Sequence, residues 1–185
     1  MNEFVPNNYR ITLTPDLTSF KFSGSAVITG YLENRCKEVS LNAVELAIWR
    51  CCVTIDGTKV KCPFIVEPAK ELLKIQLPHD CVGSLIISIE FEGLINDRMA
   101  GFYRSRFSED GQSDYLAVTQ FQESDARRAF PCLDHPQKKA TFDIELVVDD
   151  GLAAISNTLI ETEEPDENGK KRVTFKQTPI MSTYL

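Results

Sequence analysis

The stretch Phe20–Leu32, FKFSGSAVITGYL, decides the fold class because apolar and polar side chains alternate along it. Its even-numbered positions, such as Phe22 and Ile28, are apolar or small, whereas its odd-numbered positions include Lys21 and Thr29. Successive side chains of a β-strand point to opposite faces of the sheet. The alternation therefore predicts a strand with one face buried in a core and the other face in solvent.

The same period of two recurs along most of the chain, and long amphipathic helix patterns are almost absent. The pair Asp56-Gly57 suits a tight turn, so the flanking segments 49–55 and 60–66 predict a hairpin. About ten short strands can bury their apolar faces only against one another. The sequence therefore predicts an all-β domain, an antiparallel β-sandwich of stacked sheets. Further strands are expected within residues 9–13, 39–43, 73–77, 85–91, 115–122 and 140–148.

The composition fits one soluble globular domain, with 185 residues, 43% hydrophobic residues and a formal net charge of -7. The chain has no cluster of basic residues, and binding to a phosphate backbone requires Lys and Arg on one face. We therefore expect no nucleic-acid partner. No apolar run approaches the roughly 20 residues of a membrane helix, and the first residues lack the pattern of a secretory signal. We expect no membrane segment in this chain.

Six cysteines could indicate the disulfides of a secreted protein, but adjacent Cys51 and Cys52 would point to opposite faces of any strand. A chain of this length needs no covalent staples, so we expect reduced thiols and a cytoplasmic location. Cys132 and His135 have a spacing that could hold zinc, but no second Cys/His pair lies nearby. The residues therefore predict no metal site in this chain.

The segment Tyr115–Pro136, YLAVTQFQESDARRAFPCLDHP, departs from the alternating pattern because a strand runs into charged residues and prolines. Gln120 and Gln122 would share one face of that strand. Such a face could bind a polar ligand, or the charges could pair with one another and anchor a loop over the sheet. Composition alone favours the second interpretation. The charged residues are Glu123, Asp125, Arg127, Arg128 and Asp134.

The motifs of this segment and of the rest of the chain, in order, resemble one enzyme family. TQFQ at 119–122 and DARRAFPC at 125–132 are similar to the signature of the N-terminal domain in zinc aminopeptidases. The relevant branch includes puromycin-sensitive aminopeptidase and aminopeptidase N, which are gluzincin metallopeptidases. Further matching motifs are VPNNY at 5–9, FSG at 22–24, MAGFYRS at 99–105, KATF at 139–142, AISN at 154–157 and TPIMSTYL at 178–185.

The resemblance implies a saddle-shaped β domain, residues 1–185, that is the N-terminal part of a larger aminopeptidase. In the family, zinc is held by an HExxH motif on a helical domain that follows, and a GAMEN motif holds the amino end of the substrate. This chain contains neither motif. The resemblance therefore implies zinc in the full-length enzyme, none bound by this domain, no catalytic residue in this chain, and no activity for the chain alone.

The resemblance also assigns roles to residues of the 115–136 segment. Gln120 matches a glutamine that lines the pocket for the first side chain of the peptide. Gln122 stands where most members have a glutamate that binds the free α-ammonium, so weaker recognition of the amine is expected. The implied partners are peptide substrates with a free N-terminus and the catalytic domain of the parent enzyme. Structural support of the site loop is implied for Asp125, Arg127, Arg128 and Asp134.

Two functions follow from the sequence. The first is the substrate-pocket domain of an aminopeptidase that removes N-terminal amino acids from peptides. The apolar, uncapped stretch before Leu185 favours this hypothesis, because it suggests a fragment. The alternative is a stand-alone β-sandwich interaction domain, because no triad or paired-carboxylate arrangement is evident. An HExxH motif encoded after Leu185 would distinguish the two.

Overall fold

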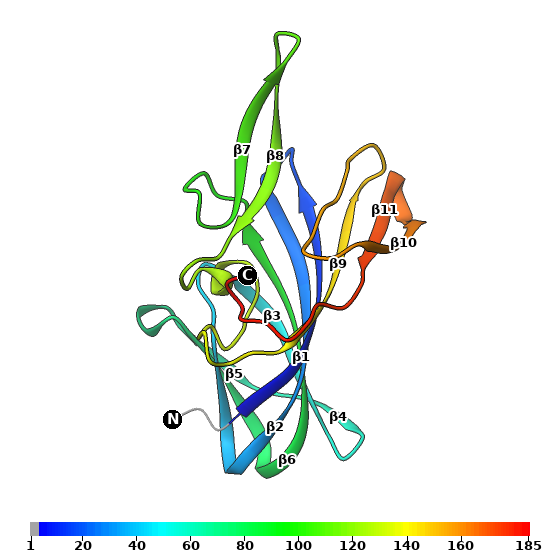
Figure 1. Ribbon diagram of the computed structural model, residues 1–185. Helices are drawn as coiled ribbons and strands as arrows, with labels where there is room; N and C mark the ends of the chain where they lie inside the picture. Colours follow the sequence, from blue (N-terminus) through cyan, green and yellow to red (C-terminus); the bar gives the residue numbers. More distant parts are fainter. Residues whose placement is uncertain (1–3) are drawn as a thin grey trace.

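The computed structural model describes residues 4–185, and within them the chain is built from strands with three short 3₁₀ turns (Figure 1). The all-β prediction is confirmed. The strands are β1 (Phe4–Asp16), β2 (Lys21–Asn42), β3 (Ala47–Ile55), β4 (Thr58–Lys61), β5 (Phe64–Glu67), β6 (Leu72–Leu94), β7 (Gly101–Glu109), β8 (Gln112–Gln120), β9 (Thr141–Asp149), β10 (Ile160–Pro165) and β11 (Lys170–Phe175). The 3₁₀ turns are η1 (Pro68–Lys70), η2 (Ala126–Arg128) and η3 (Glu167–Gly169).

One large sheet contains nine of these strands, in the order β10-β11-β9-β1-β2-β6-β3-β4 with β5 paired to β6, and β7 and β8 form a separate hairpin. The expected hairpin around Asp56-Gly57 is present as β3 and β4, but its second arm is shorter than expected, because β5 pairs with β6 and not with β3. β1 and β9 run parallel, with Tyr9 opposite Phe142, so the sheet is mixed where the alternation led us to expect antiparallel pairing throughout. A parallel pair needs a long crossover, and here most of the chain lies between the two strands.

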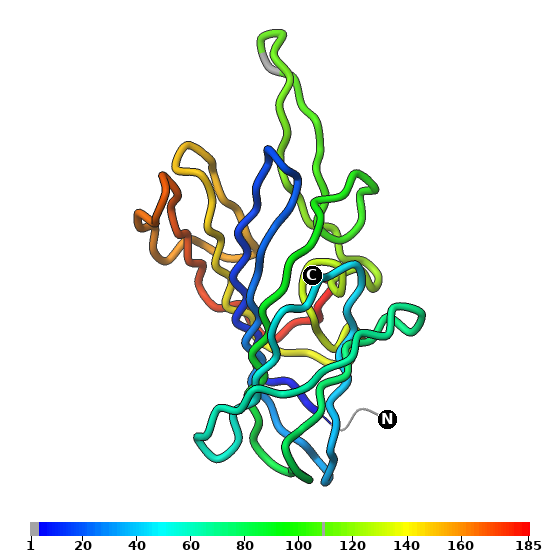
Figure 2. The backbone as a smooth tube through the Cα atoms, turned by 180° about the vertical axis from the view of Figure 1, so that it is seen from behind, coloured from blue at the N-terminus to red at the C-terminus, as the bar shows by residue number. Residues whose placement is uncertain are grey.

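The stacked layers of the predicted sandwich are formed by bending two very long strands. β2 and β6 pair along their length, but their register breaks between Leu32 and Cys36 and again between Cys36 and Glu38. Figures 1 and 2 show both strands reversing direction at the end of the molecule opposite the β7–β8 hairpin. Leu41 follows this corner on β2 and Ile75 precedes it on β6, and both are fully buried. They belong to the same core as the buried residues on the other side of the corner in each strand.

The β7–β8 hairpin projects from the body of the molecule, as both views show. Its base is attached through Phe102, which is buried and contacts the Phe22 ring at 5.0 Å between centroids. After β8 the chain crosses the core, and Cys132 forms an isolated bridge to Asn42. No helix within residues 4–185 has the length and apolar character needed to cross a lipid bilayer.

Candidate functional site

A cleft of about 270 Å³ lies where the end of β8 and the last residues of the chain meet the inner face of the sheet. Its apolar floor comes from β1 and β9, whose parallel register places Ile11 beside Ile144 and Leu13 beside Leu146. Residues paired in register share a face of the sheet, so these side chains form a continuous surface. The remaining lining residues are Thr119, Gln120, Phe121, Phe130, Phe142, Ile155, Ser156, Asn157, Met181, Thr183, Tyr184 and Leu185.

Gln120 is the last residue of β8 and lines this cleft. Its partner across the hairpin is Gly101, where β7 begins with a positive φ of 69°. Strand pairing therefore stops at Gln120, and Gln122 lies beyond it in a turn that is closed by a 2.9 Å hydrogen bond from the Asp125 amide to the Phe121 carbonyl. The expectation that Gln120 and Gln122 share a strand face is wrong. Gln122 is exposed and is not among the lining residues.

Arg127 ties the loop after β8 to two other parts of the chain. Its Nε donates to Asp134 Oδ2 at 3.0 Å and its Nη1 donates to Glu71 Oε2 at 2.6 Å. The side chain of Asp134 is only 1% exposed, and its second oxygen accepts from Thr183 Oγ1 at 2.7 Å. Burial disfavours the charged guanidinium, but the hydrogen bonds that Arg127 donates to Asp134 and Glu71 outweigh burial and raise the pKa of Arg127.

Arg128 makes a second, more exposed set of contacts on the same loop. Its Nε donates to Asp125 Oδ1 at 2.8 Å, and its Nη1 donates to Glu45 Oε2 at 3.0 Å. Glu45 also pairs with Arg98. The hydrogen bond from Arg98, and more weakly the charge of Arg128, lower the pKa of Glu45. The four charged residues expected around this loop, Asp125, Arg127, Arg128 and Asp134, are thus all engaged in ion pairs.

Aromatic rings pack between the loop and the sheet and hold the two together. Tyr9 stacks on Phe142 with 5.0 Å between ring centroids, and its hydroxyl oxygen accepts from the Leu133 amide at 3.1 Å. Burial raises the pKa of Tyr9, and burial also raises the pKa of the Cys132 thiol well above its ordinary range. Burial therefore favours the neutral form of both groups.

The described residues do not offer a site for zinc. No three His, Cys, Asp or Glu side chains within residues 4–185 are grouped so that they could hold a metal ion. Cys132 is buried, whereas His135 is exposed and its Nδ1 accepts from the Gln137 amide at 3.2 Å. His79 is exposed as well. The donor set therefore does not fit the metal that the resemblance implies for the full-length enzyme.

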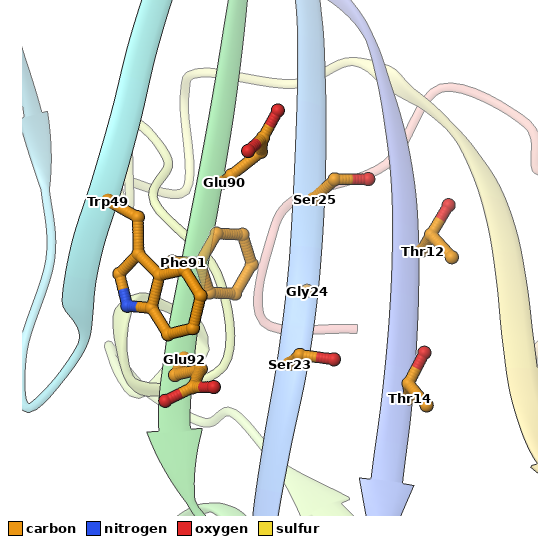
Figure 3. A pocket seen from close by; sticks show the side chains of 9 residues that line it. All are labelled: Thr12, Thr14, Ser23, Gly24, Ser25, Trp49, Glu90, Phe91 and Glu92. Atoms are coloured by element: carbon orange, nitrogen blue, oxygen red, sulfur yellow. The ribbon is translucent and has the colours of Figure 1, made fainter.

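A second hollow of about 290 Å³ is lined by Thr12 and Thr14 of β1, which alternate along the strand with the cleft residues Ile11 and Leu13 (Figure 3). Alternate residues of a strand point to opposite faces, so this hollow lies on the other face of the sheet. Trp49 is the extra residue of a bulge between Ile48 and Arg50, and the residue is 60% exposed. Figure 3 shows the indole lying over β6 between Glu90 and Glu92. The remaining lining residues are Ser23, Gly24, Ser25 and Phe91.

Among the residues that line the cleft, sequence reasoning assigned a site role to Gln120 alone. Ser156 and Asn157 belong to a loop that is distant in sequence, and Tyr184 and Leu185 close the cleft from the end of the chain. The sequence feature that could have indicated this part of the cleft is Ile155, an apolar residue in a segment without alternation. In the structure it is 87% exposed. In the sequence, both segments resemble motifs of the family, and the segment before Leu185 also suggested a fragment.

Comparison with known proteins agrees with this architecture along the whole chain. Residues 5–185 match the Peptidase M1 N-terminal domain. The chain is 38% identical over 188 residues to "Aminopeptidase 2, mitochondrial" of Saccharomyces cerevisiae, covering 98% of the chain and 19% of that protein. It is 36% identical over 182 residues to "Aminopeptidase 2" of Candida albicans, covering 97% and 19% respectively.

A third relative is "Puromycin-sensitive aminopeptidase" of Caenorhabditis elegans, 36% identical over 185 residues, with 97% of this chain and 20% of that protein covered. The chain spans about a fifth of the length of each of these relatives. The match is continuous over the strands, the loop after β8 and the cleft-lining end of the chain. This chain therefore belongs to the Peptidase M1 N-terminal domain family.

Proposed function

We propose that this chain is the N-terminal domain of a zinc aminopeptidase and that it forms part of the pocket for the first residue of a peptide. The observation that carries the proposal is the position of Gln120 at the edge of the cleft above an apolar floor. A mostly apolar cleft with a few polar groups is the usual form of a small-ligand site. The apolar floor suits a side chain, and the Gln120 amide can both donate and accept hydrogen bonds.

Gln122 would meet the free amino end of the peptide. Its amide is exposed in the turn directly after β8, two residues from the cleft-lining Gln120. An amide oxygen can accept a hydrogen bond from an ammonium group, but a carboxylate forms a charge-assisted bond that is about twice as strong. The ion pairs of Arg127 and Arg128 would position this turn without touching the peptide.

The partner of this domain would be the catalytic domain of the same enzyme. Apolar side chains at the rim of the cleft are left in solvent, including Ile155 at 87% and Leu185 at 55% exposure. Exposed apolar groups beside a cleft are typical of an interface between domains. Zinc and the groups that act on the peptide bond would belong to that domain, because the residues that the structure describes, 4–185, do not fit the metal. We place the enzyme in the cytoplasm on its cysteine usage alone.

The test measures kcat/KM for one peptide substrate in the complete enzyme with Gln, Glu and Ala at position 122. Gln122→Glu should raise kcat/KM several-fold, since a charge-assisted bond exceeds a neutral one by about 1 kcal/mol. Gln122→Ala and Gln120→Ala should lower kcat/KM while the melting temperature stays unchanged. Gln112→Ala is the matched control, because Gln112 is an exposed amide at the far end of β8.

Unaltered kcat/KM in both alanine variants would remove the proposed pocket role. Sequencing the transcript beyond the codon for Leu185 provides an independent check. An HExxH motif there supports the proposal, whereas its absence would leave the stand-alone interaction domain as the function.

A further inference from the structure

Cys36 and Cys81 lie opposite each other at the corner where the long strands β2 and β6 bend. They are direct partners in the antiparallel register, and the register is broken on both sides of this single pair. Residues directly opposite in an antiparallel pair have Cα atoms about 4.5 to 5.5 Å apart. Disulfides span Cα distances of roughly 4.4 to 6.8 Å, so the backbone separation suits a disulfide.

The two side chains also face the same side of the sheet. Cys81 is 4% exposed and belongs to the main core, and Cys36 is half-buried and packs against that core. Direct cross-strand partners have Cβ atoms about 4.5 to 5.5 Å apart, slightly more than the 3.5 to 4.5 Å of a disulfide. The breaks in register leave this pair outside a continuous hydrogen-bond ladder, so a small approach of the strands does not disrupt neighbouring pairs.

We propose that Cys36 and Cys81 are a modification site that forms an intrachain disulfide with a small-molecule disulfide, such as glutathione disulfide, and so closes the corner of the sheet. The pair would remain as thiols in a reducing compartment and become linked when the ratio of oxidised to reduced glutathione rises. This inference concerns the corner alone and does not depend on the proposed aminopeptidase function.

The reaction requires two thiol–disulfide exchanges. The Cys36 thiolate, which is the more accessible of the two, attacks one sulfur of glutathione disulfide, and the S–S bond breaks to release one glutathione thiolate that takes up a proton. The Cys81 thiolate then attacks the Cys36 sulfur of the mixed disulfide and releases the second glutathione. The protein loses two protons and two electrons, and one glutathione disulfide becomes two glutathione thiols.

The surroundings of Cys81 support this order. Cys81 Sγ donates to the His79 carbonyl at 3.1 Å and lies 3.5 Å from His79 Nδ1, which is also 3.2 Å from the Asp80 carbonyl oxygen. Burial raises the pKa of Cys81, which makes it the slower first nucleophile. Cys62 lies nearby but is buried and donates its thiol to the Val60 carbonyl at 3.7 Å.

The experiment incubates the folded, fully reduced chain with excess glutathione disulfide, blocks remaining thiols with an alkylating agent, and maps the peptides by mass spectrometry. We expect a Cys36–Cys81 linked peptide and loss of the mass of two hydrogens from the intact chain. Cys36→Ser and Cys81→Ser should each prevent the link, and Cys62→Ser should retain it. The wild-type map needs no variant, so the test remains decisive if a variant fails to fold.

A second readout is thermal unfolding. The link closes a loop between two distant positions, so oxidation should raise the melting temperature of the wild-type chain by roughly 5 to 15 °C and leave that of Cys36→Ser unchanged. A stable mixed disulfide without the internal link, a link between Cys62 and Cys81, or no reaction at these two thiols in the folded chain would each overturn the proposal.

Discussion

The β7–β8 hairpin and the loop that follows it, residues 121–140, are consecutive in the chain but differ in how they contact the rest of the molecule. The hairpin projects from the body, and its two strands pair only with each other apart from contacts at its base (Figure 1). The loop is held over the core by buried aromatic rings and by the ion pairs of Arg127. Gln120 and Gln122 lie at the junction, where the last strand pair of the hairpin holds Gln120 and the turn that begins the anchored loop holds Gln122.

The largest effect should come from removing Arg127, the half-buried cation that pairs with the buried Asp134. Arg127→Ala leaves the carboxylate of Asp134, with a side chain only 1% exposed, without its charged partner. Loss of one member of a buried ion pair costs about 3 to 5 kcal/mol, measurable as a lower free energy of unfolding in urea. Arg127→Lys keeps the charge but loses the planar fork, so its cost should be smaller. Equal stability of wild type and Arg127→Ala would show that the loop is not anchored in this way.

The junction itself should respond to Gly101→Ala. Gly101 has a φ of 69°, and a Cβ built there would lie 2.5 Å from Arg128 Cβ. The left-handed backbone and the overlap together should cost about 2 to 4 kcal/mol in the same denaturation assay. Gly111→Ala at the hairpin tip is the matched control, because its φ is 79° but nothing lies within 4 Å. The control should lose only about 1 kcal/mol, and an equal loss in both variants would contradict the tight packing of the junction.

A smaller, pH-dependent effect is expected at Glu45, which pairs with Arg98 and Arg128. Its pKa is lowered from the ordinary 4.5, chiefly by the hydrogen bond from Arg98. The folded state therefore favours the charged form, and this stabilisation is present above the unfolded pKa and is lost as pH falls through the folded value. The stability difference between wild type and Glu45→Gln should be modest at pH 7 and vanish in acid. A difference that persists below both pKa values would contradict this assignment.

The smallest effect should be seen on the hairpin. Leu116 lies on β8 opposite Ser105 and is 41% exposed, so Leu116→Ser removes little buried surface. We expect a change in unfolding free energy within about 0.5 kcal/mol. Phe130→Ala, at a loop residue that is 4% exposed, is the matched comparison and should cost several times more. A large loss from Leu116→Ser would mean that the hairpin contributes to the core.

The alternation of Phe20–Leu32 and similar segments was sufficient to predict the strands, because facing inward or outward is a local property with a period of two. The motifs around Gln120 and Arg127 were sufficient to indicate the family. The alternation also predicted that the strand continues through Gln122, and this was wrong, because a strand stops where its hydrogen-bonded partner strand stops. Here the partner ends at Gly101, a residue distant in sequence whose backbone turns away.

The sequence by itself thus determined the fold class, the family and the lack of a metal-binding motif, since each depends on residue types and short spacings. Only the tertiary structure decided that β1 and β9 run parallel, that β2 and β6 bend into two layers, and that Cys36 faces Cys81 at the bend. Each of these depends on which distant segments pair and in what register. Which strands pair, and in what register, depends on how all the strands together bury their apolar faces, so the sequence of one segment does not determine it.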